Sequence, residues 1–129
     1  MSDGDGRGGL NGVVVAHGTL ASAMVDAAEQ ITGISGMLKA VSNSGCDRGA
    51  LEERIWAAIG EAPSVVFVDL AAGSCLIAVL RRVRERPDVR VVTGVNLAML
   101  VDFLFHRSLP AEEAAAHAAA SGGSAIRVP

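Results

Sequence analysis

Residues Asn11–Leu20, NGVVVAHGTL, decide how this 129-residue chain folds, because an apolar run stops there at a histidine, a glycine and a threonine. Residues 13–15 are consecutive valines without alternation, which is typical of a strand covered on both faces of a parallel sheet. Gly18 suits a tight turn, and Thr19 can cap a following helix. The stretch therefore predicts a buried strand that delivers His17 to the rim of a sheet.

Strand and helix patterns alternate along the rest of the chain. Further strands are predicted at Met37–Val41, Ser64–Val68 and Val89–Thr93. Between them, apolar residues recur at helical spacing. These residues are Leu20, Met24, Ala28 and Ile31, then Leu51, Ile55 and Ile59, then Leu76, Val79, Leu80 and Val83, and finally Leu97, Leu100, Val101, Leu104 and Phe105. The alternation predicts an α/β fold, a doubly wound and mostly parallel four-stranded sheet with helices on both faces.

Polar residues mark the ends of several helices. Asp47 can cap the second helix and Asn96 the fourth. An alanine-rich helix is expected at Ala111–Ala120, ended by the serine and two glycines that follow it. Ser124–Val128 is expected to form a short final edge strand. An exposed edge of this kind favours a homodimer in which the strand is buried.

Composition excludes several classes of protein. The net charge of −3, the single tryptophan and the three phenylalanines argue against a nucleic-acid partner. Residues 1–9 are rich in glycine and aspartate and are expected to be a disordered leader, with one domain spanning residues 10–129. No signal core or membrane span is found, so we expect a cytoplasmic protein. Cys46 and Cys75 show no zinc spacing, and we expect free thiols, no metal ion and no cofactor.

Three predicted strands end in polar, turn-forming residues. His17, Gly18 and Thr19 follow the first strand, Asp69 follows the third with Gly73 and Ser74 beyond it, and Asn96 comes shortly after the fourth. Carboxyl ends of parallel strands share one edge of a sheet, where open α/β folds build their sites. His17 and Asp69 are therefore predicted to be neighbours.

A histidine beside a carboxylate suits transfer through the imidazole ring. The carboxylate accepts a hydrogen bond from one ring nitrogen, which fixes the tautomer and leaves the other nitrogen free as a nucleophile. Ser74 and the amides of the Gly73-Ser74 turn, at a helix N-terminus, can cradle an anion. Phosphorus is a fitting target, because a phosphohistidine passes its group on reversibly.

The segments VVVAHGTLASAM, VFVDLAAGSC and VVTGVNLAMLVDFL together resemble the mannose-type enzyme IIA of the bacterial phosphoenolpyruvate-dependent sugar phosphotransferase system. The resemblance runs from about Asn11 to Val128, and Gly94–Leu100, GVNLAML, is its most specific part. It implies a cytoplasmic phosphocarrier. Such a carrier accepts a phosphoryl group from the histidine carrier protein HPr and passes it to a IIB component for sugar uptake, meeting the membrane permease only through its partners.

The resemblance also assigns roles to residues. It implies that His17 is phosphorylated, that Asp69 orients it, and that Gly73 and Ser74 form the phosphate-binding turn. We expect Gly18 and Thr19, which follow His17 directly, to bind the phosphate as well. The resemblance further implies a carboxyl-terminal antiparallel strand exchanged between two subunits. The chain departs from the family at residues 71–75, AAGSC, where aromatic-Gly-Gly-Ser-Pro is usual, and at Ala98, where proline is frequent.

Two other classes of phosphate-handling protein require residues that this chain lacks. A phosphoaspartate receiver needs acidic residues after the first strand, where this chain has Ala16 and His17. The C-x5-R spacing of Cys75 and Arg81 matches a tyrosine-phosphatase loop, but the intervening residues are an apolar helical segment.

Two residues have alternative predicted roles. Cys75 is a redox thiol of lowered pKa or a small buried residue, and Asn96 is a helix cap or a wall of the site. His106 and His117 suit surface or capping roles. A regulatory phosphohistidine module and the subunit that feeds dihydroxyacetone kinase remain alternatives to transport, although that subunit shows His-Ser where this chain has His17-Gly18.

Overall fold

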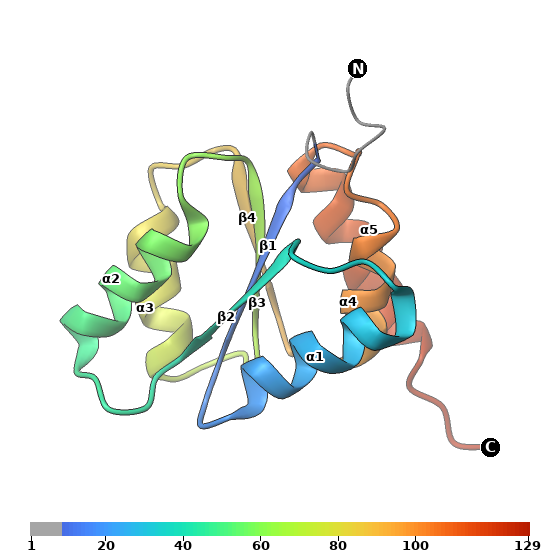
Figure 1. The fold of residues 1–129 in the computed structure, drawn as a ribbon, viewed down its shortest axis with the longest axis horizontal. Coiled ribbons are helices and arrows are strands. Elements are labelled where there is room, and N and C mark those ends of the chain that lie inside the picture. The colour runs from blue at the N-terminus through green and yellow to red at the C-terminus, as the bar shows by residue number, and fades with distance from the viewer. Residues whose placement is uncertain (1–8) are drawn as a thin grey trace.

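Four parallel strands form the centre of the molecule. The computed structural model describes residues 9–129, and most of the expected leader lies outside the described residues. The strands β1 (Asn11–Ala16), β2 (Leu38–Ser42), β3 (Ser64–Val68) and β4 (Val89–Thr93) lie in the order β2-β1-β3-β4 (Figure 1). Val15 pairs with Val41 on one side and Val68 on the other. The predicted doubly wound, parallel α/β sheet is confirmed.

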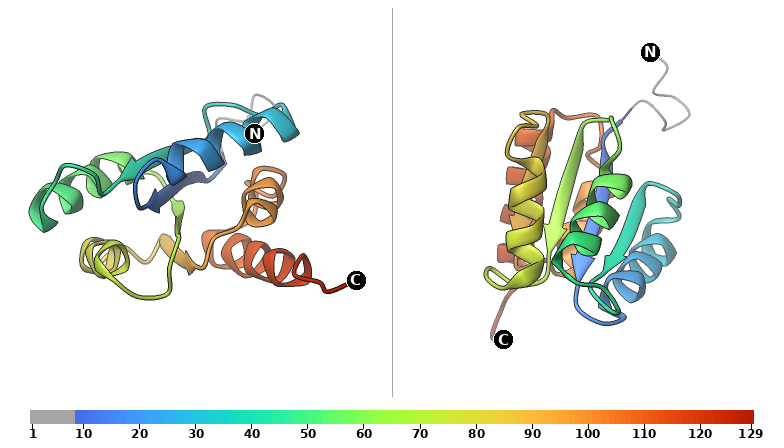
Figure 2. Two further views of the ribbon diagram at one scale, coloured as in Figure 1. Left: turned by 90° about the horizontal axis from the view of Figure 1, so that it is seen from below. Right: turned by 90° about the vertical axis from the view of Figure 1, so that its left-hand side faces the viewer.

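Helices cover both faces of this sheet. The helices α1 (Leu20–Thr32), α4 (Leu97–Leu104) and α5 (Ala111–Ser124) pack on one face, and α2 (Arg48–Ile59) and α3 (Ser74–Val83) pack on the other (Figure 2). None of the helices in residues 9–129 has the length and apolar character needed to span a bilayer.

The core consists of two apolar layers, one on each face of the sheet. Alternate residues of each strand point to opposite faces, so that Val14 and Phe67 face α4 while Val13 and Val66 face α2 and α3. Phe67 meets Phe103 of α4 edge to face, with 5.4 Å between ring centroids. Burial on both faces explains why β1 and β3 are uninterrupted apolar runs.

Two of the three predicted helix caps are confirmed. Asp47 accepts a hydrogen bond from the Ala50 amide at 2.9 Å, and Asn96 accepts one from the Met99 amide at 3.1 Å. Thr19 precedes α1 but makes no side-chain cap bond. That prediction was wrong.

Three helices bury other residues than the spacing predicted. α1 buries Ala21 and Ala28, and leaves Leu20 44% and Ile31 60% exposed. α3 buries Cys75, Ala78, Val79 and Val83, and leaves Leu80 48% exposed. Phe105, which was predicted to lie on the apolar face of the fourth helix, lies just past α4 and is 60% exposed. The buried residues of α3 are spaced by three, one and four positions, which places them on one helical face, and Leu80 falls outside that face.

The carboxyl end differs most from expectation. α5 continues through both glycines to Ser124, and residues 125–129 form no strand in the single chain (Figure 1). Gly122 is buried, and a Cβ built there would lie 2.4 Å from Cγ of Met99. The glycine that was predicted to end the helix thus allows α5 to pack closely on α4. Strand exchange between two subunits stays a prediction.

Candidate functional site

The carboxyl edge of the sheet gathers the polar residues that follow its strands. β1 lies between β2 and β3, and the chain leaves β1 toward α1 on one face but leaves β3 toward α3 on the other. Because the two connections leave toward opposite faces, a crevice forms between them at the carboxyl ends of β1 and β3, where α/β folds commonly place their sites. His17 follows β1 there, and Asp69 follows β3.

His17 and Asp69 are in direct contact, as the sequence predicted. Nδ1 of His17 lies 2.8 Å from Oδ2 of Asp69, and the His17 backbone amide donates a hydrogen bond to the same oxygen at 3.0 Å. The His17 side chain is 42% exposed, whereas that of Asp69 is only 9% exposed. A buried carboxylate thus holds an accessible imidazole from beneath.

This contact determines which ring nitrogen is available. Burial works to raise the pKa of Asp69, but the hydrogen bonds and the nearby charge of His17 outweigh burial, so that the pKa lies below its ordinary value. The carboxylate is therefore ionised near neutral pH and accepts the proton on Nδ1. Nε2 of His17 is left with its lone pair free for a reaction.

The N-terminus of α3 lies beside the imidazole. α3 begins at Ser74 after Gly73, whose φ of 102° is readily adopted only by glycine, and no side chain caps the helix. The first-turn amides of a helix have no intrahelical acceptor and carry partial positive charge. Cys75 places this turn next to His17, since its Sγ lies 3.9 Å from Nδ1. An uncapped helix end at this position suits an anion.

Ser42 and Asn43, at the end of β2, hold the turn between β1 and α1. The sequence predicted only a turn at these two residues. The Gly18 amide donates to Oδ1 of Asn43 at 3.2 Å, and Oγ of Ser42 donates to the Gly18 carbonyl at 2.7 Å. Thr19 lies next in the chain and is exposed. Ser42 and Asn43 were missed although they occupy the carboxyl end of β2, the strand next to β1, where the rule that paired His17 with Asp69 applies equally.

Cys75 is a buried neighbour of the imidazole. Burial and the Asp69 carboxylate raise the pKa of its thiol, contrary to the lowered value that a redox role requires. Ligand atoms of His17, Asp69 and Cys75 lie within 4.8 Å of one another and could in principle surround a metal ion. The raised thiol pKa opposes such binding, because thiolate is the ligand form.

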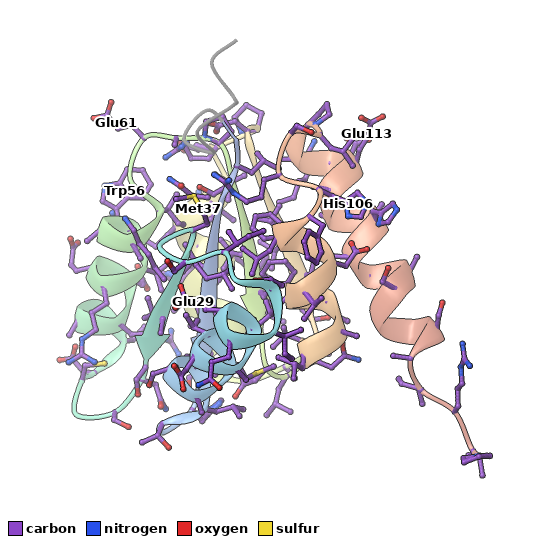
Figure 3. All side chains as sticks on the ribbon, turned by 45° about the vertical axis from the view of Figure 1, so that its right-hand side comes forward. Glu29, Met37, Trp56, Glu61, His106 and Glu113 are labelled. Carbon is purple, nitrogen blue, oxygen red and sulfur yellow. The ribbon has the colours of Figure 1, made fainter. Side chains whose placement is uncertain are left out.

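Asn96 joins two helices. Its Oδ1 caps α4, and its Nδ2 donates to the Gly122 carbonyl of α5 at 3.0 Å. Both ends of the amide are therefore engaged in holding α4 and α5 together. His106 and His117 lie against each other and against Asp102 where α4 meets α5, and Figure 3 labels His106 there. They form a group separate from that of His17, Asp69 and Cys75.

Comparison with known proteins identifies the family of the chain. Residues 12–120 match the family model described as the PTS system fructose IIA component, EIIA-man. The chain belongs to this family. No curated protein matches it in sequence.

Solved structures of PTS IIA proteins share the fold. Phosphotransferase system component EIIA from Streptococcus agalactiae is 18% identical, with a TM-score of 0.85 over 92% of this chain and 96% of that one. The mannose/sorbose-specific IIA subunit from Enterococcus faecalis is 22% identical, with a TM-score of 0.80 over 94% and 95%. A sigma-54 interaction domain protein from Enterococcus faecalis is 14% identical, with a TM-score of 0.74 over 92% and 94%. At these identities the likeness establishes the fold.

Proposed function

We propose that this chain is a cytoplasmic phosphocarrier of the sugar phosphotransferase system, which accepts a phosphoryl group from phospho-HPr on His17 and passes it to a IIB component. Membership of the IIA family supports a role in phosphoryl transfer. The observation that carries the proposal is the 2.8 Å contact of His17 Nδ1 with Asp69, which leaves Nε2 of an accessible ring free.

The proposed step is an in-line exchange between two imidazoles. The lone pair of His17 Nε2 attacks phosphorus, a new N–P bond forms, and the N–P bond to the donor histidine of HPr breaks, with its electron pair returning to the donor nitrogen. His17 becomes a positively charged ring that keeps its proton on Nδ1. Asp69 stabilises that charge and prevents the ring from rotating. In transfer to IIB, a nucleophile of IIB attacks the phosphorus on His17, and the N–P bond to Nε2 breaks with its electron pair returning to that nitrogen.

Other features of the site support this reaction. The three phosphoryl oxygens carry negative charge, and the uncapped start of α3, with Gly73 and Ser74, supplies amides beside His17. We assign Gly18 and Thr19 to the opposite wall, where the bonds from Ser42 and Asn43 fix the turn. The Gly18 amide already donates its hydrogen bond to Asn43, so Gly18 shapes this wall and does not donate to the phosphate.

Exposed leucines flank the site. Leu20 is 44% exposed and Leu70 is 56% exposed, and they follow His17 and Asp69 closely in the chain. Apolar side chains that stay open to solvent around a reactive group suit the docking of a protein partner. We therefore expect HPr and IIB to cover this rim in turn while the phosphoryl group is exchanged.

A regulatory module is the second candidate. It would accept phosphate on the same His17 as a signal, with no IIB acceptor. The altered turn, Ala71–Cys75, favours this candidate, because it changes the surface next to the phosphate while leaving His17 and Asp69 in place.

Reconstitution with purified components tests the proposal. The chain is incubated with phosphoenolpyruvate, enzyme I and HPr, and then with a IIB component from the same organism. We expect one phosphoryl group per chain, its loss in His17→Ala, and its retention in the matched control His117→Ala. Phosphorylation that never passes to IIB would favour the regulatory candidate. Absence of phosphorylation in the wild type would refute both.

A further inference from the structure

A second cluster of metal-ligating side chains lies where α4 meets α5. It consists of Asp102 on α4, His106 just beyond the end of α4, and His117 on α5. One ligand atom from each of the three lies within 4.8 Å of the others. Figure 3 shows His106 at the surface, on the side of α4 and α5 that faces away from the sheet. The phosphoryl-transfer site uses none of these residues.

Distances within the cluster suit a tetrahedral ion. Nδ1 of His117 lies 2.9 Å from Oδ1 of Asp102, and Nδ1 of His106 lies 3.5 Å from the same oxygen. Ligands of a tetrahedral zinc ion, at bond lengths of about 2.0–2.2 Å, are roughly 3.3 Å apart. The two imidazoles lie side by side with 4.1 Å between ring centroids, so both can turn Nδ1 toward one point.

Asp102 is held in place as a ligand would need to be. Its side chain is only 10% exposed, and Oγ of Ser121 donates a hydrogen bond to Oδ1 at 2.8 Å. The two imidazoles are its only ion-pair partners among the described residues. An anchored carboxylate with a supporting hydroxyl is typical of metal sites, in which the surroundings orient the ligands.

Metal binding at His106 would leave no backbone carbonyl without a hydrogen-bond partner. Nδ1 of His106 also lies 2.7 Å from the Asp102 carbonyl, and it would give up this hydrogen bond on binding an ion. That carbonyl keeps a partner, since the Phe105 amide donates to it at 3.1 Å. The side chains of His106 and His117 are 37% and 49% exposed, so an ion and the water molecules that complete its shell have access.

We propose that Asp102, His106 and His117 form a binding site for a divalent metal ion of the zinc type, held by Oδ1 of Asp102 and Nδ1 of each imidazole, with water in the remaining position. Two imidazoles and a carboxylate favour Zn²⁺, Co²⁺ or Ni²⁺ over Mg²⁺ or Ca²⁺, which prefer oxygen ligands. Binding requires each imidazole to carry its proton on Nε2, because Nδ1 gives its lone pair to the ion, and the shared ion ties α5 to α4.

The site was not apparent in the sequence. Asp102 and His106 are spaced by four residues, but His117 lies on a separate helix, and the sequence reading gave both histidines surface or capping roles and expected no metal. The connection between α4 and α5 reverses the chain and brings the three residues together. Because the cluster bridges two helices, an ion there would stabilise their packing.

Zn²⁺ titration of the full chain tests the proposal. By calorimetry we expect one Zn²⁺ per chain, and at about a hundredfold excess over Kd a Tm raised by roughly 5–10 °C. The double variant His106→Gln/His117→Gln should lose both effects. His17→Gln, the matched control that removes the remaining histidine, should keep both.

Two results would overturn the site. One is Zn²⁺ binding that survives His106→Gln/His117→Gln but is lost in His17→Gln, which would place the ion at the phosphoryl-transfer site. The other is absence of binding up to about 100 μM Zn²⁺ in the folded wild type. Absorption of the Co²⁺ form in the visible region gives an independent readout, since it reports tetrahedral coordination and does not depend on phosphoryl transfer.

Discussion

Oδ2 of Asp69 accepts both the backbone amide of His17, at 3.0 Å, and the ring nitrogen Nδ1, at 2.8 Å. One carboxylate oxygen therefore fixes the start of the turn and the orientation of the imidazole together. The two residues are brought into register because β1 and β3 are adjacent parallel strands, with Val15 opposite Val68. The other oxygen of Asp69 is buried and accepts no hydrogen bond from the described residues.

Asp69→Asn tests the orienting role. The amide is isosteric but neutral, so it cannot stabilise a positively charged phosphoimidazole and can present its NH₂ group to the ring. We expect phosphoryl transfer from HPr to slow by roughly a hundredfold or more, while far-ultraviolet circular dichroism is unchanged. Rapid-quench kinetics measure the rate. Asp47→Asn is the matched control, because asparagine caps helices as well as aspartate does. Wild-type kinetics in Asp69→Asn would count against the pairing.

Gly122→Ala tests the packing of α5 on α4. A Cβ at this position would lie 2.4 Å from Cγ and 2.6 Å from Cε of Met99, so the buried Met99 side chain or the two helices must shift. We expect a loss of roughly 1–3 kcal/mol in the free energy of unfolding, measured by urea denaturation. The neighbouring variant Gly123→Ala is the control, since its Cβ meets nothing within 4 Å and alanine favours a helix. Equal stability of the two variants would show that the close contact does not form.

The turn at residues 71–75 tests partner choice. Ala71 and Ala72 stand where the family usually has bulkier or more flexible residues, whereas Gly73 and Ser74 keep the amides at the start of α3. We expect phosphate acceptance from HPr to persist and delivery to a standard mannose-type IIB to be poor. Both half-reactions are measured with purified partners and compared with a variant carrying Phe-Gly-Gly-Ser-Pro at these positions. Equal delivery by the two proteins would show that the altered turn is neutral.

The carboxyl-terminal segment tests the expected homodimer. Ile126 is 76% exposed and Val128 is 98% exposed in the single chain, so two apolar side chains lack packing partners. We expect a dimer at micromolar concentration by sedimentation velocity, and a monomer after deletion of residues 125–129, which leaves α5 intact. A wild-type monomer that the deletion leaves unchanged would refute both the dimer and the exchange of this segment.

The strands could be predicted closely because their apolar runs are buried on both faces and carry no competing signal. β3 and β4 have the predicted bounds, and the helix caps at Asp47 and Asn96 were read correctly from local chemistry. Gly122 was misread because its role depends on Met99, which lies on another helix. Local chemistry could not distinguish a glycine that ends a helix from one that allows two helices to touch.

In the candidate site, too, some contacts could be predicted from the sequence and others could not. The pairing of His17 with Asp69 follows from parallel topology alone, since both residues end neighbouring strands. Asn43 obeys the same rule, but its stretch of serine, asparagine and glycine reads locally as a simple turn. Asp102, His106 and His117 could not be grouped from sequence, because only the reversal between α4 and α5 brings them together.

The position of the phosphoryl group tests the central claim most directly. The chain is phosphorylated by phosphoenolpyruvate, enzyme I and HPr with ¹⁵N-labelled histidine, and the modified atom is located by mass spectrometry and by ³¹P–¹⁵N couplings at alkaline pH. Because Nδ1 of His17 is held by Asp69, we predict one acid-labile phosphoryl group on Nε2 of His17. A phosphoryl group on Nδ1 of His17, on His106 or His117, or retained in full by His17→Ala, would contradict it.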